Sequence, residues 1–191
     1  MTQQERMAIL RETGAITEGH FLITSSHRHT GRMVQLARLF EDPAKTKAIL
    51  ADLAAEFAGT QVDLVLGPAI GGILPAYELS SQLGTKNIFC ERENGRMRLR
   101  RGYQIENGAR VLIAEDVITT GGSLREVLAL VRAAGGVPVG IAAIANLAAS
   151  RLDFGVPLYS AVCIAPESFD EDECPYCQKG IALIRPASRS I

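Results

Sequence analysis

The chain has 191 residues, of which 47% are hydrophobic and 21% are charged, and its net charge is −1. This length suits one domain with a complete core, and near-neutrality gives no general attraction to nucleic acid or anionic membranes. No apolar run approaches the ~20 residues that span a bilayer. The start MTQQERMAIL lacks secretory-signal features, and four cysteines do not make a disulfide scaffold, so we expect a cytoplasmic protein without nucleic-acid or membrane partners.

Helices and strands alternate along most of the chain. One helix begins at Asp42 and Pro43, which suit the N-cap and the first helical position, and is predicted to end at Gly59. Continuous apolar runs such as VDLVL are typical of strands buried on both faces. In chain order we predict a helix over 2–14, a turn-rich stretch over 24–31, a helix over 43–59, a strand over 62–66, a helix over 73–84, strands over 87–90 and 111–114, a helix over 123–134 and a strand over 137–145.

The order of these elements predicts the fold class. Strand–helix alternation of this kind gives a central parallel sheet with helices on both faces. Ser123 and Glu126 have the spacing of a capping box at the start of the 123–134 helix. Because the sequence contains no repeat and no low-complexity linker, we expect residues 1–191 to form one α/β domain.

Two of the predicted strand-to-helix turns carry unusual residues, GPAIGG at 67–72 and EDVITTGGS at 115–123. In open parallel sheets, ligands bind beyond the carboxyl ends of the strands, which is where both turns lie. Neither turn matches the Walker A pattern GxxxxGK[ST] or the dinucleotide-binding pattern GxGxxG. The sequence therefore disfavours a mononucleotide P-loop and a Rossmann dinucleotide site.

The second turn combines an anion site with two carboxylates. Residues 119–123 offer consecutive backbone N–H groups and three hydroxyls at a helix N-terminus, where the helix dipole also favours a phosphate. Ionised carboxylates only accept hydrogen bonds, so Glu115 and Asp116 require donors such as sugar hydroxyls or a hydrated metal. A phosphorylated sugar offers a phosphate and a hydroxyl pair a few ångströms apart. We therefore interpret the ligand as a ribose phosphate.

The stretch VLIAEDVITTGGS resembles the 5-phosphoribosyl-1-diphosphate (PRPP) motif of the type I phosphoribosyltransferases. Four further segments, EGHFLITSSHRHTGRMVQ, VDLVLGPAIGGI, ERENGRMRLRRGYQI and CPYCQKGIALIRPASR, are similar to the hood, diphosphate-loop strand, flexible catalytic loop and C-terminal tail of orotate phosphoribosyltransferases. The resemblance covers nearly the whole chain. It implies a type I phosphoribosyltransferase fold with a small hood over about 1–40 and a flexible loop over about 92–103. The implied reaction transfers phosphoribose from PRPP to orotate, giving orotidine 5′-monophosphate and diphosphate in pyrimidine synthesis.

The same resemblance implies roles for individual residues. Glu115 and Asp116 would hold the ribose hydroxyls, and residues 67–72 would line the diphosphate, because glycine lets backbone N–H groups approach closely. Mg²⁺ would be held mainly through PRPP oxygens, so no protein metal ligand is assigned. The implied PRPP-binding residues are Ala69, Ile70, Gly71, Gly72, Arg92, Arg96, Glu115, Asp116, Val117, Ile118, Thr119, Thr120, Gly121, Gly122 and Ser123.

The segment between Glu91 and Arg101 is rich in arginine. Such a run is often a solvated hairpin, and it can also mark RNA contact. Near the two turns we favour a role at the diphosphate leaving group, because guanidinium groups bind oxyanions bidentately and closure of a loop excludes water. Arg92, Arg96 and Asp116 are therefore the candidate catalytic residues. In the resembled family this loop reaches the active site of the partner subunit, which implies a homodimer.

The half of the site that would bind the base departs from the family pattern. Arg96 stands where the family often has a catalytic lysine, and arginine keeps the charge but cannot give up a proton. Leu147 stands where many relatives have an arginine that binds orotate, and losing such a charge-assisted bond typically removes about 1.5–3 kcal/mol. Arg151 is the candidate substitute, and Thr119 and His29 are the other candidate orotate-binding residues. His29 and Arg32 are also available as partners of a phosphate or of the loop.

The cysteines and histidines do not show a complete metal site in the sequence. Cys174 and Cys177 form one CxxC pair, which is half of a zinc site. We therefore interpret this pair as a structural turn of the tail. The remaining cysteines and histidines, which show no second pair with metal-ligand spacing, are Cys90, Cys163, His20, His27 and His29.

Two alternatives to an orotate phosphoribosyltransferase stay open. Leu147 is consistent with a phosphoribosyltransferase that uses another base, such as a purine. A non-catalytic, PRPP-binding regulatory protein could retain the same fold. No DNA-binding extension is visible at either end of the sequence, which weighs against the regulatory alternative.

Overall fold

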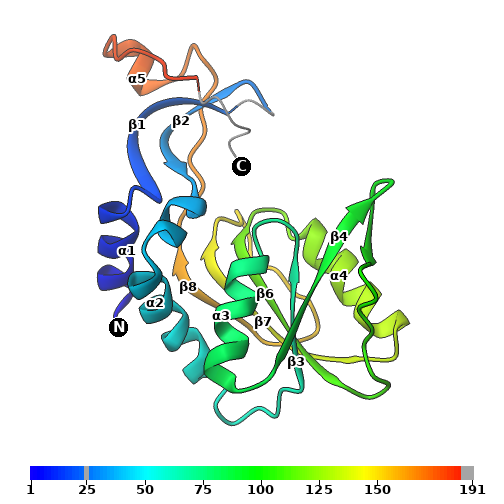
Figure 1. The fold of residues 1–191 in the computed structure, drawn as a ribbon. Helices are drawn as coiled ribbons and strands as arrows, with labels where there is room; N and C mark the ends of the chain where they lie inside the picture. Colours follow the sequence, from blue (N-terminus) through cyan, green and yellow to red (C-terminus); the bar gives the residue numbers. More distant parts are fainter. Residues whose placement is uncertain (24–25, 186–191) are drawn as a thin grey trace.

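The computed structural model describes residues 1–23 and 26–185 (Figure 1). A six-stranded sheet with helices on both faces forms the body, and a two-stranded sheet stands above one end of it. Residues 24–25 of the predicted turn-rich stretch and residues 186–189 of the tail segment lie outside the described residues. In the described part of the chain, no helix has the length and apolarity needed to cross a membrane.

The order of elements confirms the predicted alternation of strands and helices. The helices are α1 (Gln3–Glu12), the 3-10 helix η1 (Leu36–Glu41), α2 (Pro43–Glu56), α3 (Ile73–Leu83), α4 (Gly122–Ala133) and α5 (Pro175–Gln178). The strands are β1 (Ile16–Ile23), β2 (Arg28–Val34), β3 (Leu64–Pro68), β4 (Lys86–Glu93), β5 (Arg96–Leu99), β6 (Arg110–Ile118), β7 (Val137–Asn146) and β8 (Leu158–Cys163).

The body sheet has the strand order β5-β4-β3-β6-β7-β8. All neighbouring pairs are parallel except β4 and β5, which are antiparallel at one edge. Helices α1, α2 and α3 cover one face, and α4 covers the other (Figure 1). The predicted α/β class with a central parallel sheet is confirmed. This topology brings the carboxyl ends of β3 and β6, and therefore both unusual turns, to the same edge.

The start of α2 forms as predicted, but its end does not. Asp42 accepts a hydrogen bond from the backbone N–H of Lys45 at 3.1 Å, and Pro43 is the first helical residue. The helix ends at Glu56, three residues before Gly59. The next residue, Phe57, is buried, with its ring 5.2 Å from that of Tyr159.

The predicted capping box at the start of α4 is wrong. The N-cap is Gly121, which has a left-handed φ of 75°, and no side chain caps the helix. Glu126 instead pairs with Arg92, which donates two hydrogen bonds of 3.1 Å to its carboxylate. A bidentate ion pair satisfies the glutamate better than a single backbone N–H. The Ser123 hydroxyl is consequently not used as a cap.

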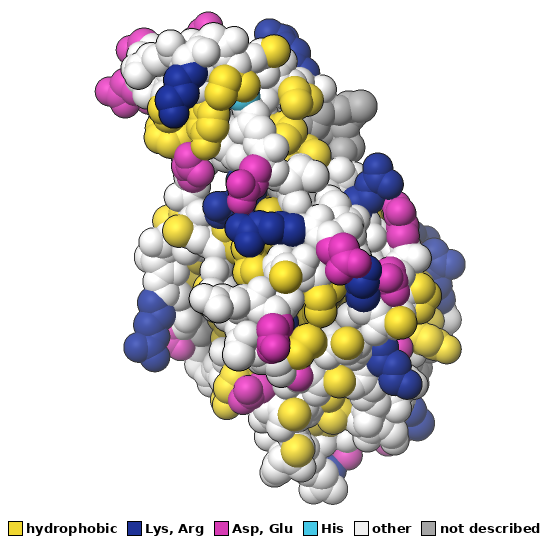
Figure 2. Space-filling model, turned by 90° about the vertical axis from the view of Figure 1, so that its left-hand side faces the viewer, with side chains coloured by type: hydrophobic (Ala, Val, Ile, Leu, Met, Phe, Trp, Pro, Cys, Tyr) yellow, Lys and Arg dark blue, Asp and Glu magenta, His cyan; other side chains and the backbone are white. Residues whose placement is uncertain are grey.

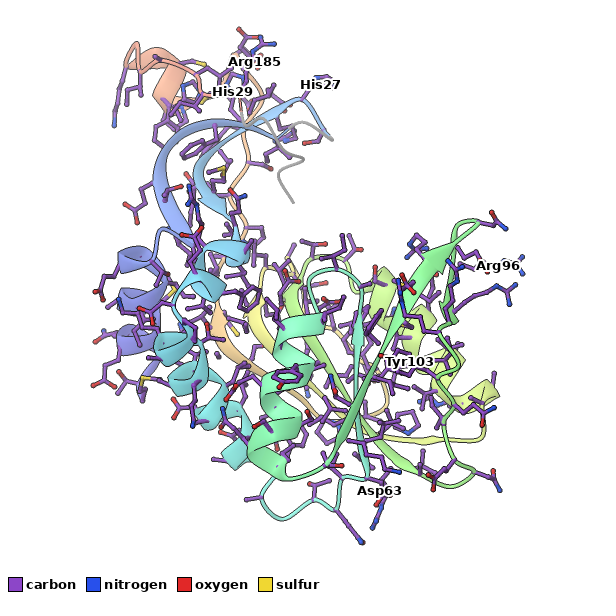
Figure 3. The ribbon with its side chains drawn as sticks, viewed as in Figure 1. His27, His29, Asp63, Arg96, Tyr103 and Arg185 are labelled. Carbon is purple, nitrogen blue, oxygen red and sulfur yellow. The ribbon has the colours of Figure 1, made fainter. Side chains whose placement is uncertain are left out.

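The arginine-rich segment forms the β4–β5 hairpin. Asn94 and Gly95 make its two-residue turn with φ values of 49° and 78°, the conformation that suits the twist of paired strands. The hairpin extends away from the body, and Arg96 points outward from it (Figure 3). The predicted flexible loop over about 92–103 thus coincides largely with an ordered hairpin in this structure, and its movement stays a prediction.

We use the term hood for β1, β2 and the described tail residues 165–185. The backbone of His29 exchanges two hydrogen bonds of 2.8 Å with that of Phe169, and His20 accepts one of 2.8 Å from Ile184. Arg28 binds both carboxylate oxygens of Asp170 at 2.7 and 2.8 Å. The sequence predicted a hood over about 1–40, but within that range α1 packs on β8 of the body. The hood therefore joins two segments that are far apart in the sequence.

Candidate active site

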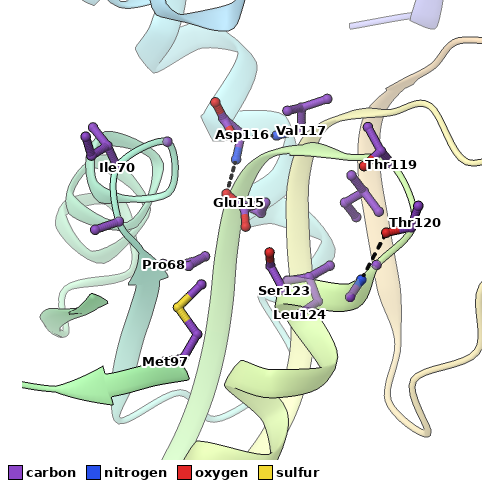
Figure 4. Close-up of a pocket in the computed structure, with 15 residues that line it drawn as sticks. Pro68, Ile70, Met97, Glu115, Asp116, Val117, Thr119, Thr120, Ser123 and Leu124 are labelled. Carbon is purple, nitrogen blue, oxygen red and sulfur yellow. Dashed lines mark hydrogen bonds between the residues drawn. The ribbon is translucent and has the colours of Figure 1, made fainter. Parts of the chain in front are cut away.

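Two adjoining cavities share the turn after β6, the first within the body and the second between the body and the hood. The first has a volume of about 280 Å³ and is lined by the turns after β3 and β6 (Figure 4). The second has a volume of about 420 Å³ and is lined mainly by β1, β2 and residues 164–168. Thr119 and Thr120 line both cavities. A ligand can therefore extend from one cavity into the other past these two threonines.

The first cavity receives the N-termini of two helices. Helix α3 follows Gly72 and helix α4 follows Gly121, and neither has a side-chain cap among the described residues. The first N–H groups of an uncapped helix have no acceptor within the helix, and they form the positive end of the helix dipole. Anions are therefore attracted to this end. Two positive helix ends therefore lie beside this cavity, and the binding of anionic groups there stays a prediction.

Two glycines keep this cavity open. A Cβ atom added to Gly71 would collide with the carboxylate of Asp116, so the turn after β3 can approach β6 only with glycine at this position. Gly121 adopts a positive φ, and a Cβ there would also lie 2.8 Å from the ring of Phe154. Each turn thus requires a glycine where its backbone approaches another element.

Glu115 and Asp116 lie side by side on β6 and face this cavity (Figure 4). The Glu115 side chain accepts a hydrogen bond of 3.2 Å from the Asp116 N–H, and Asp116 accepts one of 2.7 Å from Val117. Burial, together with the neighbouring Asp116 carboxylate, raises the pKa of Glu115 to about 9. Burial also raises the pKa of Asp116. Without a ligand the pair therefore retains a proton near neutral pH, and hydroxyl donors or a cation would favour its full ionisation.

This raised pKa predicts how ligand-free stability depends on pH. A carboxyl group whose pKa rises on folding stabilises the fold while it is protonated. That contribution is complete below the ordinary pKa of 4.5 and is lost as the pH rises toward about 9. We expect the Tm of the wild type to fall over this range more steeply than the Tm of Glu115→Gln, whose amide does not titrate. Calorimetry at pH values between about 5 and 9 measures the two slopes, and parallel slopes would refute the prediction.

The remaining residues predicted to bind PRPP divide into two groups. Ala69, Ile70, Gly71 and residues 115–123 all line the first cavity, and Thr120 accepts a hydrogen bond of 3.4 Å from the Gly122 N–H. Gly72, Arg92 and Arg96 line neither cavity in the described structure. Met97, which was not predicted, is the hairpin residue that lines the first cavity.

The second cavity is mostly apolar but contains one guanidinium group. Phe21, Met33 and Leu147 contribute apolar surface, and Arg32 is the basic residue that lines it. The Arg32 Nε atom is buried and has no hydrogen-bond partner among the described residues. Such a buried, unpaired donor indicates an acceptor that is supplied from outside the chain. The sequence offered Arg32 as a partner of a phosphate or of the loop but not as an orotate-binding candidate, because nothing in the sequence shows that β2 faces Thr119.

Two predicted orotate-binding residues lie away from this cavity. His29 is 4% exposed, and its ring points toward His20 and Cys177 rather than toward Thr119. Arg151 is exposed and lines a separate, shallow cavity beside Cys163. Of the three predicted residues, only Thr119 lines the second cavity.

Comparisons with known proteins agree with this geometry. The family model of the phosphoribosyl transferase domain matches residues 37–164. The chain is 42% identical over 191 residues to an orotate phosphoribosyltransferase of Caldanaerobacter subterraneus subsp. tengcongensis, with 100% of both chains covered. It is 44% identical over 191 residues to an orotate phosphoribosyltransferase of Pelotomaculum thermopropionicum, again with 100% of both chains covered.

Solved structures share the fold. The orotate phosphoribosyltransferase from Aeropyrum pernix matches with a TM-score of 0.65 and 24% identity, covering 82% of this chain and 92% of that chain. The adenine phosphoribosyltransferase from Rhodothermus marinus matches with a TM-score of 0.64 and 22% identity, covering 83% of this chain and 99% of that chain. The same body thus occurs in proteins named for different bases.

Proposed function

Because the chain belongs to the phosphoribosyl transferase family and, within it, to the orotate phosphoribosyltransferases, we propose that it transfers phosphoribose from PRPP to orotate. The products are orotidine 5′-monophosphate and diphosphate, and the enzyme is a pentosyltransferase of pyrimidine synthesis. Full-length identity to relatives of this name is the observation that carries the proposal. The polar cavity beside an apolar one supports it, since PRPP and a flat base need these two environments.

The first cavity would hold PRPP. Its 5′-phosphate would accept hydrogen bonds from the backbone of residues 119–123, at the uncapped start of α4. The diphosphate would lie against residues 68–72, at the uncapped start of α3. Glu115 and Asp116, between the two, would accept hydrogen bonds from the ribose hydroxyls. This arrangement would hold the sugar at both ends.

Mg²⁺ fits the chemistry of the same cavity. The two neighbouring carboxylates have raised pKa values and no positive partner among the described residues, and Mg²⁺ prefers oxygen ligands, including those of phosphates. Bound with PRPP, the ion would offset the negative charge of the diphosphate. We assign Glu115 and Asp116 as the residues nearest to it.

The chain's own residues would stabilise the reaction at C1′. The bond from C1′ to the diphosphate oxygen breaks and its electron pair leaves with the diphosphate. A bond forms from C1′ to a ring nitrogen of orotate, whose N–H proton passes to the diphosphate or to water. Positive charge develops on the ribose during this exchange, and Asp116 and Glu115 would stabilise that charge electrostatically. The turn at 68–72 would receive the negative charge that develops on the leaving group. Both effects would act in the cavity lined by residues 68–71 and 115–124.

We propose that two chains cooperate in each site. Arg96 lies on a hairpin that projects from the body, where it can reach a neighbouring chain (Figure 3). Leu74 and Tyr77 on α3 are 50% and 64% exposed, and they offer an apolar surface for a second copy. A homodimer in which Arg92 and Arg96 of one chain act on the diphosphate of the other explains why neither lines a cavity of its own chain. Because the four cysteines are free, we propose a reducing cytoplasm as the location.

Mixing two inactive variants tests this proposal. We expect Arg96→Ala and Asp116→Asn to be poorly active alone, because each lacks one half of every site. Exchange of subunits in an equal mixture gives about half heterodimers, each with one intact site, so that about a quarter of wild-type activity returns. Activity is assayed after mixing, and sedimentation of the same sample shows whether the chains are dimeric. Restored activity in a dimeric sample supports a shared site. A mixture no more active than its components would contradict it.

The second cavity would hold the acceptor base. Orotate carries a carboxylate, and Arg32, whose buried Nε has no partner among the described residues, is the basic residue in the described lining of this cavity. Leu147, which stands where many relatives have an arginine, also lines this cavity. A base bound in the cavity would therefore lie beside that position. The apolar lining would contact the flat ring. Arg32 would therefore take over the recognition that the resembled family assigns to the missing arginine.

A panel of bases tests the acceptor. The protein is incubated with PRPP, Mg²⁺ and either orotate, uracil, adenine, guanine or hypoxanthine, and diphosphate release is measured. Consumption of orotate alone supports the proposal. Leu147 and the apolar lining favour a purine phosphoribosyltransferase as the second candidate, and turnover of only a purine would establish that function instead. PRPP binding without any turnover would indicate a regulatory protein.

A further inference from the structure

The hood contains a group of metal-ligating side chains outside the active site, which we call the Cys–His cluster: His20, His29, Cys174 and Cys177. One ligand atom of each residue lies within 4.8 Å of all the others. Cys174, His20 and His29 are 0%, 1% and 4% exposed. Figure 2 accordingly shows histidine only as a small patch among hydrophobic side chains in the upper part of the molecule. Four polar groups therefore converge in the interior of a small module.

The distances in the cluster match a tetrahedral metal site. Bonds of about 2.3 Å to sulfur and 2.0–2.1 Å to nitrogen place tetrahedral ligand atoms roughly 3.3–3.8 Å apart. His20 Nε2 lies 3.1 Å from His29 Nδ1, 3.5 Å from Cys174 Sγ and 3.7 Å from Cys177 Sγ. Cys177 Sγ lies 3.2 Å from His29 Nδ1. A single ion at their centre needs only small adjustments of these side chains.

The surroundings of His20 prepare it as a ligand. Its Nδ1 atom lies 2.7 Å from the carbonyl oxygen of Ile181. A proton on Nδ1 donates to that carbonyl, and the lone pair of Nε2 then points at the other three ligand atoms. A backbone carbonyl in this position fixes the tautomer of metal-binding histidines. The ring of Tyr176 stacks on that of His20 with centroids 5.6 Å apart, which further restricts its orientation.

We propose that the Cys–His cluster binds one Zn²⁺ ion. Two thiolates and two neutral imidazoles in a closed tetrahedron form the ligand set of structural zinc sites, and all four positions are filled by protein. Without an ion, the His20 Nε2 atom can accept a hydrogen bond from only one of its three neighbours. The thiols of Cys174 and Cys177 are weak donors and acceptors, so the cluster is then held by weak hydrogen bonds. The sequence-based interpretation of the cysteine pair as a plain turn missed this site. His29 and Cys174, the nearest histidine and cysteine of the cluster in the sequence, are 145 positions apart. The two histidines, His20 and His29, do not have a spacing typical of metal ligands.

The ion would connect the tail residues 165–185 to the β1–β2 hairpin. The histidines lie on β1 and β2, and the cysteines lie at the start and in the last turn of the short helix α5. Figure 3 shows His29 beside this tail and His27 at the outer end of the β1–β2 hairpin. Of the described apolar side chains of the hood, only Ile16, Phe21 and Cys174 are buried, and modules with so small a core usually need a metal or disulfides. Because hairpin and tail also line the second cavity, the ion would hold the roof of that cavity in place. The site does not depend on the transferase reaction.

Metal analysis of the reduced wild type tests the proposal directly. The protein is purified without chelators, supplied with Zn²⁺, desalted and analysed by plasma mass spectrometry and by native mass spectrometry. We expect one zinc per chain, released together with reaction of two thiols by an organomercurial. A reduced chain that retains less than about 0.1 zinc, or a native mass that shows a Cys174–Cys177 disulfide, would overturn the proposal. One equivalent of iron at the same residues would overturn the assignment to zinc.

Matched variants locate the ion. Cys177→Ser and His29→Gln each remove one ligand, whereas Cys163→Ser and His27→Gln change the same residue types outside the cluster. We expect the first pair to lose stoichiometric zinc and to lower the Tm by more than about 5 °C. The second pair should keep both. Zinc that remains bound in Cys177→Ser and His29→Gln would overturn the assignment of these ligands.

A spectrum of the cobalt-substituted protein provides a measurement that does not require activity. Co²⁺ in a tetrahedral site with two thiolates gives intense visible d–d bands and a sulfur-to-cobalt charge-transfer band. We expect both bands in the wild type and in Cys163→Ser, and a weaker charge-transfer band when one thiolate is replaced in a folded Cys177→Ser. A spectrum typical of octahedral cobalt in the wild type would contradict the proposed geometry.

Discussion

Asp116→Asn should lower kcat/KM for PRPP by about 10²–10³-fold, the usual effect of removing one group that stabilises transition-state charge. Asparagine keeps the shape of the side chain, but it is neutral and presents two donor hydrogens toward a sugar whose hydroxyls are themselves donors. The loss should affect kcat as well as KM, because the positive charge on the ribose develops only during the reaction. Steady-state kinetics with saturating orotate measures both constants.

The fold should tolerate this substitution. Burial raises the pKa of Asp116, which means that the folded state disfavours the ionised carboxylate. The carboxylate accepts a local hydrogen bond from Val117, and the amide oxygen of asparagine can replace it. We therefore expect the Tm of Asp116→Asn to equal or slightly exceed that of the wild type at neutral pH. A carboxylate that mainly supported the core would show the opposite, a fall in Tm that accompanies the fall in activity.

Asp63→Asn is the matched control. Asp63 lies at the opposite end of the body from the cavities (Figure 3), where it accepts hydrogen bonds from the Arg110 backbone at 2.9 Å and from its side chain at 2.7 Å. These bonds lower the pKa of Asp63 to about 2. The same substitution there should leave kcat/KM unchanged and reduce stability modestly. Equal kinetic losses in both variants would show that the effect of Asp116→Asn is not local to the cavity.

The PRPP half of the site could be predicted because it is encoded by contiguous sequence. A strand, a turn and a helix follow one another over residues 111–133, and the residues that would contact phosphate and ribose are neighbours in the chain. The parallel topology then brings residues 68–72 to the same edge without further information. Local patterns therefore sufficed to predict that Glu115, Asp116 and the Thr- and Gly-rich turn lie together at one cavity, whereas their contacts with PRPP stay a prediction.

The other features depend on contacts between distant segments. The second cavity combines β1, β2, Thr119, Leu147 and residues 164–168, and no local spacing relates these parts. The capping box failed for the same reason, because Arg92 reaches Glu126 across 34 residues and offers two charge-assisted bonds. The Cys–His cluster unites residues 145 or more positions apart. Sequence patterns relate residues that are near one another along the chain. These features are instead formed by contacts between distant segments, such as those of the tail residues 165–185 with the β1–β2 hairpin.

The structure distinguishes two arginines that could recognise the acceptor base. Arg32 faces the second cavity with a buried Nε that lacks a partner among the described residues, whereas Arg151 is exposed beside a different cavity. The sequence favoured Arg151, on proximity to Leu147 alone. Arg32 is half-buried and Arg151 is exposed, so water screens a bond from Arg32 to a carboxylate less than one formed by Arg151.

Arg32→Gln should therefore raise the KM for orotate by about 10–100-fold, the equivalent of one charge-assisted hydrogen bond, and should change the KM for PRPP little. Arg151→Gln, the matched control, should change neither constant by more than about twofold. Uracil lacks the carboxylate, so the preference of the enzyme for orotate over uracil should fall in Arg32→Gln by the same factor as kcat/KM for orotate. If Arg151→Gln loses that preference instead, the tail or the 147–151 segment must close over the base in the complex, and recognition belongs to the residue that the sequence favoured. If neither variant loses it, the orotate carboxylate is held by uncharged groups such as Thr119 and its backbone.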